Sequence, residues 1–327
     1  MTQPSFLSRR DVLAAGTLAA LGALSGSAAA QSPWPSKPIT IVVPFSPGSA
    51  TDTSARLIAE KLGPRLNVPV IVDNKPGASG TIGSQFAARA QPDGYTLILT
   101  SSSTHSATPA LFRKLSFDPT GDFVHVIRIA TIPMMLVVRS EAPYRQLQDL
   151  VEASRTQPLA YAYGSPTSQI AGATFNRLTG GDANAVPYKS QPPAVTDLLG
   201  GQVDYLFADL SVVTSFMQAG RLRGLAFTGK TRAKGFPAVP TLEELGHQNF
   251  DLVVWVGVAV PAKTPDAITQ RLNREVAAIL REPDVLQRLE SLGMQVAPNT
   301  LAEHADFTQA QRRIWTQRAI DARIEPQ

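Results

Sequence analysis

Two loops rich in glycine and proline carry the residue pattern that connects most directly with chemistry. They cover residues 44–52 (PFSPGSATD) and 74–83 (NKPGASGTIG), and each lies between an apolar run and a pattern typical of a helix. A strand that turns through glycine into a helix directs backbone N–H groups beyond the sheet, because the first N–H groups of a helix have no partner within it. The two loops therefore predict a binding site for an anion.

A run of hydroxyl side chains ends a third apolar segment and could donate hydrogen bonds at the same site. It covers residues 100–105 (TSSSTH), and α/β proteins bind ligands beyond the carboxyl ends of their strands. Asp52 could instead cap the first helix and fix its loop, and Phe45 could pack in the core instead of lining a pocket. The ligand contacts expected from the three segments are Phe45, Ser46, Pro47, Gly48, Ser49, Thr51, Asp52, Gly77, Ala78, Ser79, Gly80, Thr100, Ser101, Ser102 and His105.

The usual reactive groups of enzymes and metal sites do not stand out in the sequence. There is no cysteine, which excludes thiolate nucleophiles, thiolate metal sites and disulfides. The four histidines have no metal-binding spacing, and no Gly-x-Ser-x-Gly, dinucleotide or phosphate-loop motif is present. We expect no catalytic residue, no metal and no cofactor. Lys and Arg are spread along a chain of formal net charge +4 without a basic block, so we expect no nucleic-acid partner.

The first thirty residues have the pattern of an export signal. A twin-arginine pair, Arg9 and Arg10, precedes an apolar stretch over residues 12–24, and Ala28 to Ala30 supply small residues for cleavage. The apolar stretch is short for a membrane span, although an uncleaved anchor is an alternative. We expect a cleaved signal and a periplasmic protein, with the twin-arginine and general secretory routes both open.

Strand-like and helix-like segments alternate along the rest of the chain. Residues 39–43, 68–72 and 95–100 are expected strands, and the pattern of Ala55, Ile58, Ala59 and Leu62 predicts a first helix that ends at Gly63-Pro64. A second alternating unit follows, with strands at 159–162, 203–207 and 222–227. Alternation with short links predicts parallel sheets with right-handed crossovers. The length of the chain favours two domains, and we expect the chain to cross between them near residues 131–137 and 253–259.

The sequence resembles the Bug family, the extracytoplasmic receptors of tripartite tricarboxylate transporters. The resemblance rests on the order and spacing of several motifs from about Trp34 to Arg318. They are PFSPG with Asp52, NKPGASG, PDGYTL (92–97), VPYK (186–189), DLLGGQVD (197–204), PTLEELG (240–246), Trp255 with Gly257, and the segment 261–265. The sequence departs from the family pattern at Ser49, where a second glycine is common, and at Gln169, where His is common.

The resemblance implies an α/β fold: a two-lobed periplasmic binding protein, type II-like, with parallel-rich sheets in each lobe and two interdomain crossovers. Lobe 1 would comprise 31–133 plus 255–327, and lobe 2 would comprise 134–254. It adds Ser165, Gln169, Tyr188 and Asp209 to the expected contacts. The implied function is capture of a small carboxylate by a monomer that delivers it to a membrane permease with large and small subunits. An exported hydrolase or isomerase using the same cleft, or a ligand-sensing partner of a membrane kinase, are the alternatives.

Overall fold

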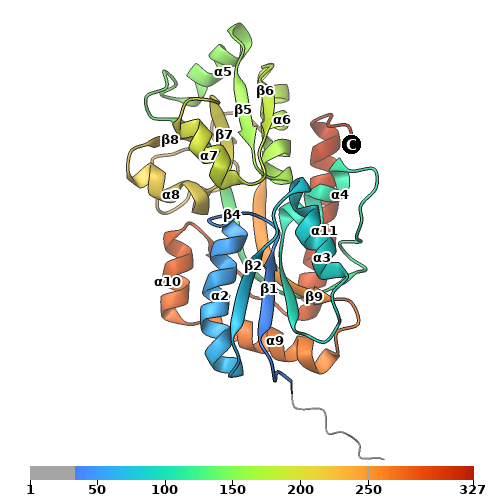
Figure 1. The fold of residues 1–327 in the computed structure, drawn as a ribbon. Helices are drawn as coiled ribbons and strands as arrows, with labels where there is room; N and C mark the ends of the chain where they lie inside the picture. The colour runs from blue at the N-terminus through green and yellow to red at the C-terminus, as the bar shows by residue number, and fades with distance from the viewer. Residues whose placement is uncertain (1–33, 249) are drawn as a thin grey trace, which may run out of the picture. The chain divides into compact units, whose positions relative to one another are not determined.

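The structure is a computed structural model that describes residues 34–248 and 250–327. The predicted export signal over residues 1–30 lies outside the described residues, so it stays a prediction. The fold below is that of residues 37–327, which group as one unit. Figure 1 shows this part of the chain as two α/β lobes joined by long strands.

The first lobe is built around a central apolar strand, β1. Strand β1 pairs in parallel with β2 on one side and with β3 on the other, and four of its five residues are fully buried. Buried parallel strands read as continuous apolar runs because helices cover the sheet. The elements of this part are β1 (Ile39–Val43), α2 (Ala50–Leu66), β2 (Val70–Asn74), the short 3-10 turn η1 (Ala78–Gly80), α3 (Thr81–Ala88), β3 (Thr96–Ser101), the π-helical turn η2 (Ser103–Ala107) and α4 (Thr108–Leu111).

The second lobe has a similar arrangement around β5. Strand β5 pairs in parallel with β6 and β7, while β7 and β8 pair antiparallel with a long shared strand, β4. The elements of this lobe are α5 (Leu147–Thr156), β5 (Ala160–Tyr163), α6 (Pro166–Thr179), β6 (Asn184–Pro187), α7 (Gln191–Leu199), β7 (Tyr205–Asp209), α8 (Leu210–Gln218) and β8 (Leu222–Phe227).

Strand β4 (Phe123–Arg139) belongs to both lobes and changes its partner in the middle. It pairs antiparallel with β9 (Val253–Pro261) as far as Pro133, and with β7 from Met134 onward. Together the strands form a ten-stranded sheet in the order β2-β1-β3-β9-β4-β7-β5-β6, with β8 and β10 (Gln295–Val296) also paired to β4. The two-lobed α/β fold is therefore confirmed. The predicted lobe boundary at residue 133 falls at the change of partner, and the boundaries themselves stay a prediction.

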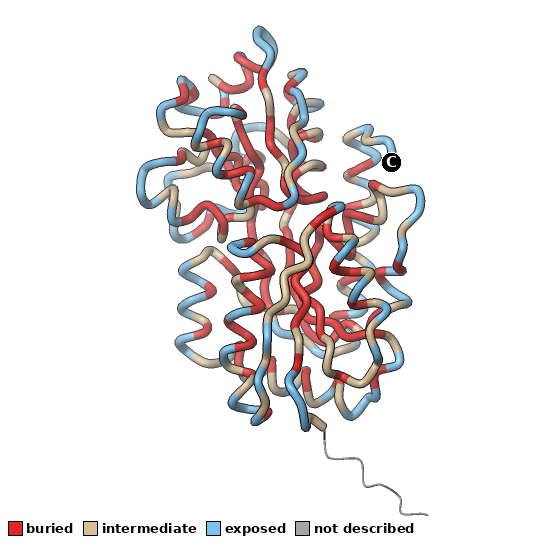
Figure 2. Tube along the Cα trace, viewed as in Figure 1, coloured by how far each residue is buried: buried red, intermediate tan, exposed pale blue. Residues whose placement is uncertain are grey.

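The C-terminal segments return to the first lobe. Helix α9 (Asp266–Ile279) packs against α2 and β4, and β10 (Gln295–Val296) pairs with β4. Helix α10 (Pro283–Ser291) lies between them in the chain, and the last helix, α11 (Leu301–Asp321), contacts η2 and α4 of the first lobe and α6 of the second. Figure 2 shows that buried residues follow the strands while exposed residues follow the outer faces of the helices. No helix within the described ranges has both the length and the apolar character that a membrane crossing needs.

Two local predictions differ from the structure. Helix α2 continues past Gly63-Pro64 to Leu66, because Pro64 stands in the last turn, where its missing N–H removes only one helical bond. The turn is closed at Asn67, which adopts the left-handed conformation (φ 55°). The second difference is the length of β4, of which the sequence indicated only the crossing near residues 131–137.

Candidate functional site

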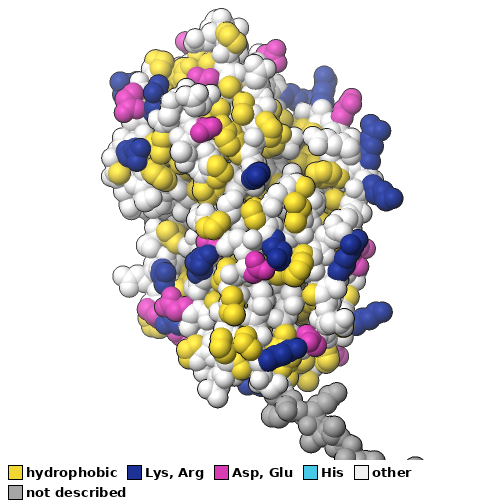
Figure 3. All heavy atoms as spheres, in the orientation of Figure 1, with side chains coloured by type: hydrophobic (Ala, Val, Ile, Leu, Met, Phe, Trp, Pro, Cys, Tyr) yellow, Lys and Arg dark blue, Asp and Glu magenta, His cyan; other side chains and the backbone are white. Residues whose placement is uncertain are grey.

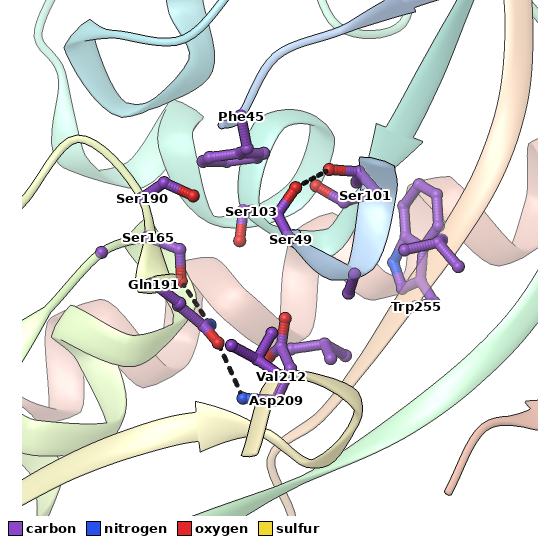
Figure 4. Close-up of a pocket in the computed structure, with 15 residues that line it drawn as sticks. Phe45, Ser49, Ser101, Ser103, Ser165, Ser190, Gln191, Asp209, Val212 and Trp255 are labelled. Carbon is purple, nitrogen blue, oxygen red and sulfur yellow. Dashed lines mark hydrogen bonds between the residues drawn. The ribbon is translucent and has the colours of Figure 1, made fainter. Parts of the chain in front are cut away.

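A cavity lies between the two lobes, at the ends of β1, β3, β5 and β7. In this arrangement of the lobes the cavity is narrow, with a volume of about 30 Å³. Figure 4 shows its polar side chains and the aromatic rings of Phe45 and Trp255 around this space. The lining residues are Phe45, Ser49, Ala50, Thr51, Ser101, Ser103, Gly164, Ser165, Ser190, Gln191, Asp209, Val212, Val254, Trp255 and Val256.

The first glycine-rich loop forms one end of the cavity and is fixed by hydrogen bonds to Asp52. Gly48 adopts φ +82°, and its N–H donates to Asp52 Oδ2 at 2.9 Å. Asn74 Nδ2 donates to Asp52 Oδ1 at 2.9 Å, and Arg56 forms an ion pair with the same carboxylate. Burial acts to raise the pKa of Asp52, but the hydrogen bonds from Arg56, Gly48 and Asn74 outweigh it and lower the pKa. Asp52 therefore fixes the loop, and Ser49 caps α2 by accepting from the Asp52 N–H at 3.3 Å.

The second glycine-rich loop packs behind the first and contributes no residue to the cavity lining. A Cβ on Gly80 would lie 2.6 Å from Thr104 Cγ2 and 3.2 Å from Phe45 Cζ. A Cβ on Gly83 would lie 2.9 Å from the Cα of Pro44. Contacts this short are not found in close-packed interiors, so these positions need glycine for close packing. The loop thus sets the position of Phe45, which is 5 % exposed and forms part of the cavity wall.

Hydroxyl groups from the end of β3 and from η2 form the next part of the wall. Ser101 and Ser103 line the cavity. Ser102 instead points to the neighbouring strand, where its Oγ accepts the backbone N–H of Trp255 at 2.7 Å. Ser103 Oγ lies 2.9 Å from Thr167 Oγ1 of α6, so this bond links the two lobes.

The second lobe contributes a short chain of polar contacts centred on Gln191. Its Nε2 donates to Ser165 Oγ at 3.3 Å, and its Oε1 accepts the backbone N–H of Asp209 at 2.9 Å (Figure 4). Gln191 is 4 % exposed, and these bonds fix the direction in which its amide group points. Burial raises the pKa of Asp209 to about 6, and a hydrogen bond with Gln191 opposes that rise in part.

Four helices begin at residues of the cavity wall. The capping positions are Ser49 for α2, Ser165 for α6, Ser190 for α7 and Asp209 for α8. Each N-terminus carries unpaired N–H groups and about half a positive charge. Among the described residues that line the cavity, none is Lys, Arg or His. The positive potential of the site therefore comes from helix ends and neutral donors, an arrangement that suits an anion.

The structure brings some of the predicted contacts to the cavity and places the others nearby. Those in the lining are Phe45, Ser49, Thr51, Ser101, Ser165 and Asp209. Those outside the lining are Ser46, Pro47, Gly48, Asp52, Gly77, Ala78, Ser79, Gly80, Thr100, Ser102, His105, Gln169 and Tyr188. Contact of any of these residues with a ligand stays a prediction.

Several residues outside the lining have contacts that explain their position. Tyr188 donates its hydroxyl to Asp197 Oδ2 at 2.7 Å, which ties the end of β6 to α7. Gln169 is half-buried in the first turn of α6. His105 is fully buried, with its Nδ1 2.8 Å from Thr104 Oγ1 and its ring against Phe123 and His125. Burial lowers its pKa well below the usual histidine value, so His105 is a neutral core residue.

The lining contains residues that the sequence did not single out as contacts. They are Ala50, Gly164, Ser190, Gln191, Val212, Val254, Trp255 and Val256. Ser103 also lines the cavity and belongs to the hydroxyl run over residues 100–105, although it is not among the individual contacts predicted from that run. Ser190 and Gln191 stand directly before a Pro-Pro pair that opens a helix, so the strand-to-helix signal used for the first loop could have found them. Within the described part of the chain, no group of three His, Cys, Asp or Glu side chains is placed to hold a metal ion.

A two-lobed α/β unit with helix N-termini around a cavity between its lobes has the architecture of a solute-binding protein. The sequence matches the model of the tripartite tricarboxylate transporter family receptor (TctC) over residues 54–323. The chain belongs to this family of receptors. Family membership places it in the periplasm, in a system that works with a tripartite transporter.

Individual relatives agree with this assignment. The chain is 36% identical to Protein BugT of Bordetella pertussis over 265 residues, which cover 80% of this chain and 81% of BugT. A solved structure of the periplasmic binding protein BugD is 30% identical, with a TM-score of 0.86 over 90% of this chain and 100% of that one. The structure of Rpa4515 from R. palustris with adipate is 32% identical, with a TM-score of 0.87 over 90% and 100% of the two chains. The resemblance stated from the sequence is therefore confirmed.

Proposed function

We propose that this receptor binds a small organic carboxylate in the cavity between its lobes. The carboxylate would accept hydrogen bonds from the first N–H groups of α2, at Ala50 and Thr51, and from the hydroxyls of Ser49, Ser101 and Ser103. Waters would complete the shell. Closure of the lobes would exclude bulk solvent and present one shape to the transporter.

The observation that carries this proposal is the convergence of four helix N-termini on a cavity whose described lining residues include no cationic side chain. Helix N-termini favour anions. The relative Rpa4515, solved with adipate, supports the same ligand class.

We extend the proposal to the export of the chain, its oligomeric state and its partner. We propose that a cleaved N-terminal signal exports it, that it acts as a monomer, and that its partner is a permease with a large and a small subunit. We also propose that it releases its ligand unchanged. The Lys and Arg side chains on the face drawn in Figure 3 are scattered among acidic and neutral ones, which suits a small-molecule receptor better than a nucleic-acid binder.

A binding screen tests the proposal. Purified protein without its first thirty residues is mixed with mono-, di- and tricarboxylates and with amino acids, and its melting is followed. A ligand at 100 times its Kd should add about 2.7 kcal/mol to the free energy of unfolding, and calorimetry should then give a saturable one-to-one isotherm. If no carboxylate changes the melting temperature or gives heat, the proposal fails.

A second measurement separates the receptor from an exported hydrolase or isomerase. The ligand found in the screen, together with its esters and amides, is incubated with the protein and followed by proton NMR. The receptor should leave every spectrum unchanged apart from broadening of the bound ligand. Turnover that survives repurification would overturn the receptor assignment.

A further inference from the structure

Three polar atoms of residues that line the cavity have no hydrogen-bond partner within the part of the chain that the structure describes. They are Ser190 Oγ, Trp255 Nε1 and Asp209 Oδ1. Buried polar atoms are nearly always paired, by protein, water or ligand. The hydroxyl and the indole N–H can donate to a carboxylate. An ionised Asp209 can only accept hydrogen bonds, so it needs a partner that donates one.

The fold leaves one oxygen of the Asp209 carboxylate, Oδ1, without a partner among the described residues. Asp209 stands at the capping position of α8, yet its side chain accepts no bond from that helix. Ser49 and Ser165 stand at the same position of α2 and α6, and both do cap their helices. The backbone N–H of Asp209 is held by Gln191, an interaction that any residue type could make. A carboxylate at this position therefore points to a ligand.

Among the described residues, no charged side chain contributes to the pKa shift of Asp209. Gln191 faces it from α7, Met134 lies opposite it on β4, and neither side chain ionises. Asp209 is the one ionisable side chain among the described residues that line the cavity. A buried charge needs a partner, and here the partner has to come from the ligand.

We propose, on the basis of the carboxylate-receptor function above, that the ligand is a carboxylate that also carries a protonated amine. Its carboxylate lies at the helix N-termini and its ammonium group donates to Asp209. Figure 4 shows Asp209 and the hydroxyl groups of Ser49 and Ser103 on opposite sides of the cavity, which provides the two ends of such a ligand with separate partners. Amino acids and related amino-carboxylates form this class.

The competing arrangement is a plain dicarboxylate that accepts a hydrogen bond from a protonated Asp209. Burial raises the pKa of Asp209 to about 6, so the free protein at neutral pH holds mostly the ionised form. The two arrangements predict opposite effects of pH. An ammonium ligand binds more weakly as Asp209 becomes protonated, whereas a plain dicarboxylate binds more tightly.

The test uses pairs of ligands that differ only by an amino group. Calorimetry at pH 7.5 compares aspartate with succinate, glutamate with glutarate, 2-aminoadipate with adipate, and alanine with propionate. In at least one pair the aminated member should bind at least tenfold more tightly. Its affinity should fall about tenfold between pH 7 and pH 5, as expected for an apparent pKa near 6.

A matched pair of variants isolates the side chain. Asp209→Asn keeps the shape and should weaken the aminated ligand at least tenfold, change the plain acid less than threefold, and abolish the pH dependence. Asp182→Asn removes an exposed carboxylate of the same lobe, outside the cavity, and should leave both affinities unchanged. If Asp209→Asn does not fold, the pH profile of the unchanged protein still decides.

The outcomes separate this inference from the proposed function. Tight binding of a plain acid without preference for its aminated partner, or with affinity rising toward pH 5, overturns the inference and leaves the carboxylate receptor intact. A preference for the aminated ligand that survives in Asp209→Asn also overturns it. Absence of binding by every member of every pair, and in the wider carboxylate screen, overturns both.

Discussion

Ser103 and Thr167 share a hydrogen bond of 2.9 Å between their side-chain oxygens, and this bond joins the two lobes beside the cavity. Thr167 Oγ1 lies in turn 3.0 Å from Ser165 Oγ, which accepts from Gln191. A continuous series of hydroxyl and amide contacts thus runs from η2 of the first lobe to α7 of the second. The described arrangement therefore has the character of a closed form, in which small polar groups hold the lobes together.

The first prediction concerns this link between the lobes. Replacing Ser103 by Ala should shift the protein toward an open form and weaken ligand binding by roughly two- to tenfold, because one hydrogen bond contributes about 0.5–1.5 kcal/mol. Small-angle scattering without ligand should give a larger radius of gyration. Ser291→Ala, on α10 and exposed, is the control and should change neither value. Unchanged affinity and unchanged scattering in Ser103→Ala would show that the link does not hold the closed form.

The second prediction concerns the second glycine-rich loop. Gly80 (φ +83°) and Gly246 (φ +88°) have nearly the same backbone conformation, but only Gly80 has close neighbours, since no heavy atom lies within 4 Å of a Cβ on Gly246. Gly246→Ala should cost about 1 kcal/mol of unfolding free energy for the left-handed backbone. Gly80→Ala should cost a further 1–3 kcal/mol, roughly, from overpacking.

The same pair of variants also tests how the loop acts on the site. Because a Cβ on Gly80 would press on Phe45 and Thr104, Gly80→Ala should weaken ligand binding as well as folding. Urea unfolding and calorimetry on both variants measure the two effects. Equal stability losses in the two variants would mean that the packing behind Phe45 is loose.

Local sequence signals were sufficient for the first wall of the cavity. The strand, the glycine at positive φ and the capping serine of the first loop are all contiguous, so Ser49 and Thr51 could be predicted without tertiary information. The second loop has the same local pattern, yet it lies behind Phe45. Which of two similar loops faces the ligand depends on packing against η2, and that packing joins residues far apart in the sequence.

The cavity wall from the second lobe and the shared strand β4 could not be predicted fully from the sequence, for a different reason. Gln191 carries no motif, and its role follows from its contacts with Ser165 and Asp209, which lie 26 and 18 residues away. The sequence predicts only part of strand β4, because this segment contains Pro133 and has no alternation of polar and apolar residues. In the structure Pro133 stands where β4 leaves β9 and meets β7, a place where the missing N–H of proline is tolerated.

The third prediction concerns Asp52. Asp52→Asn removes the charge that accepts from Gly48, Asn74 and Arg56, and should cost about 2 kcal/mol at pH 7, the scale of hydrogen bonds to charged groups. The pKa of Asp52 is lowered in the folded protein. Its stabilisation is therefore present above the unfolded pKa of 3.8 and is lost as the pH falls through the folded pKa. Urea unfolding from pH 7 to pH 3 should show the difference between wild type and variant shrinking toward acid; a constant difference would contradict this role.

The fourth prediction concerns Asp209 in the ligand-free protein, where stability should depend on pH in the opposite direction to that expected for Asp52. The pKa of Asp209 is about 6 in the folded protein and 3.8 in the unfolded chain. The contribution of Asp209 to the free energy of unfolding is therefore fully present below pH 3.8 and is lost as the pH rises through 6. The full difference corresponds to about 3 kcal/mol, and solvent reaches part of the residue, so we expect about 2 kcal/mol. Asp209→Asn, which stays neutral, should therefore gain stability over wild type between pH 4 and pH 7.5. Urea unfolding across this range, with Asp182→Asn as the control, measures the gain; equal pH profiles for wild type and Asp209→Asn would show that the buried carboxylate is already compensated within the protein.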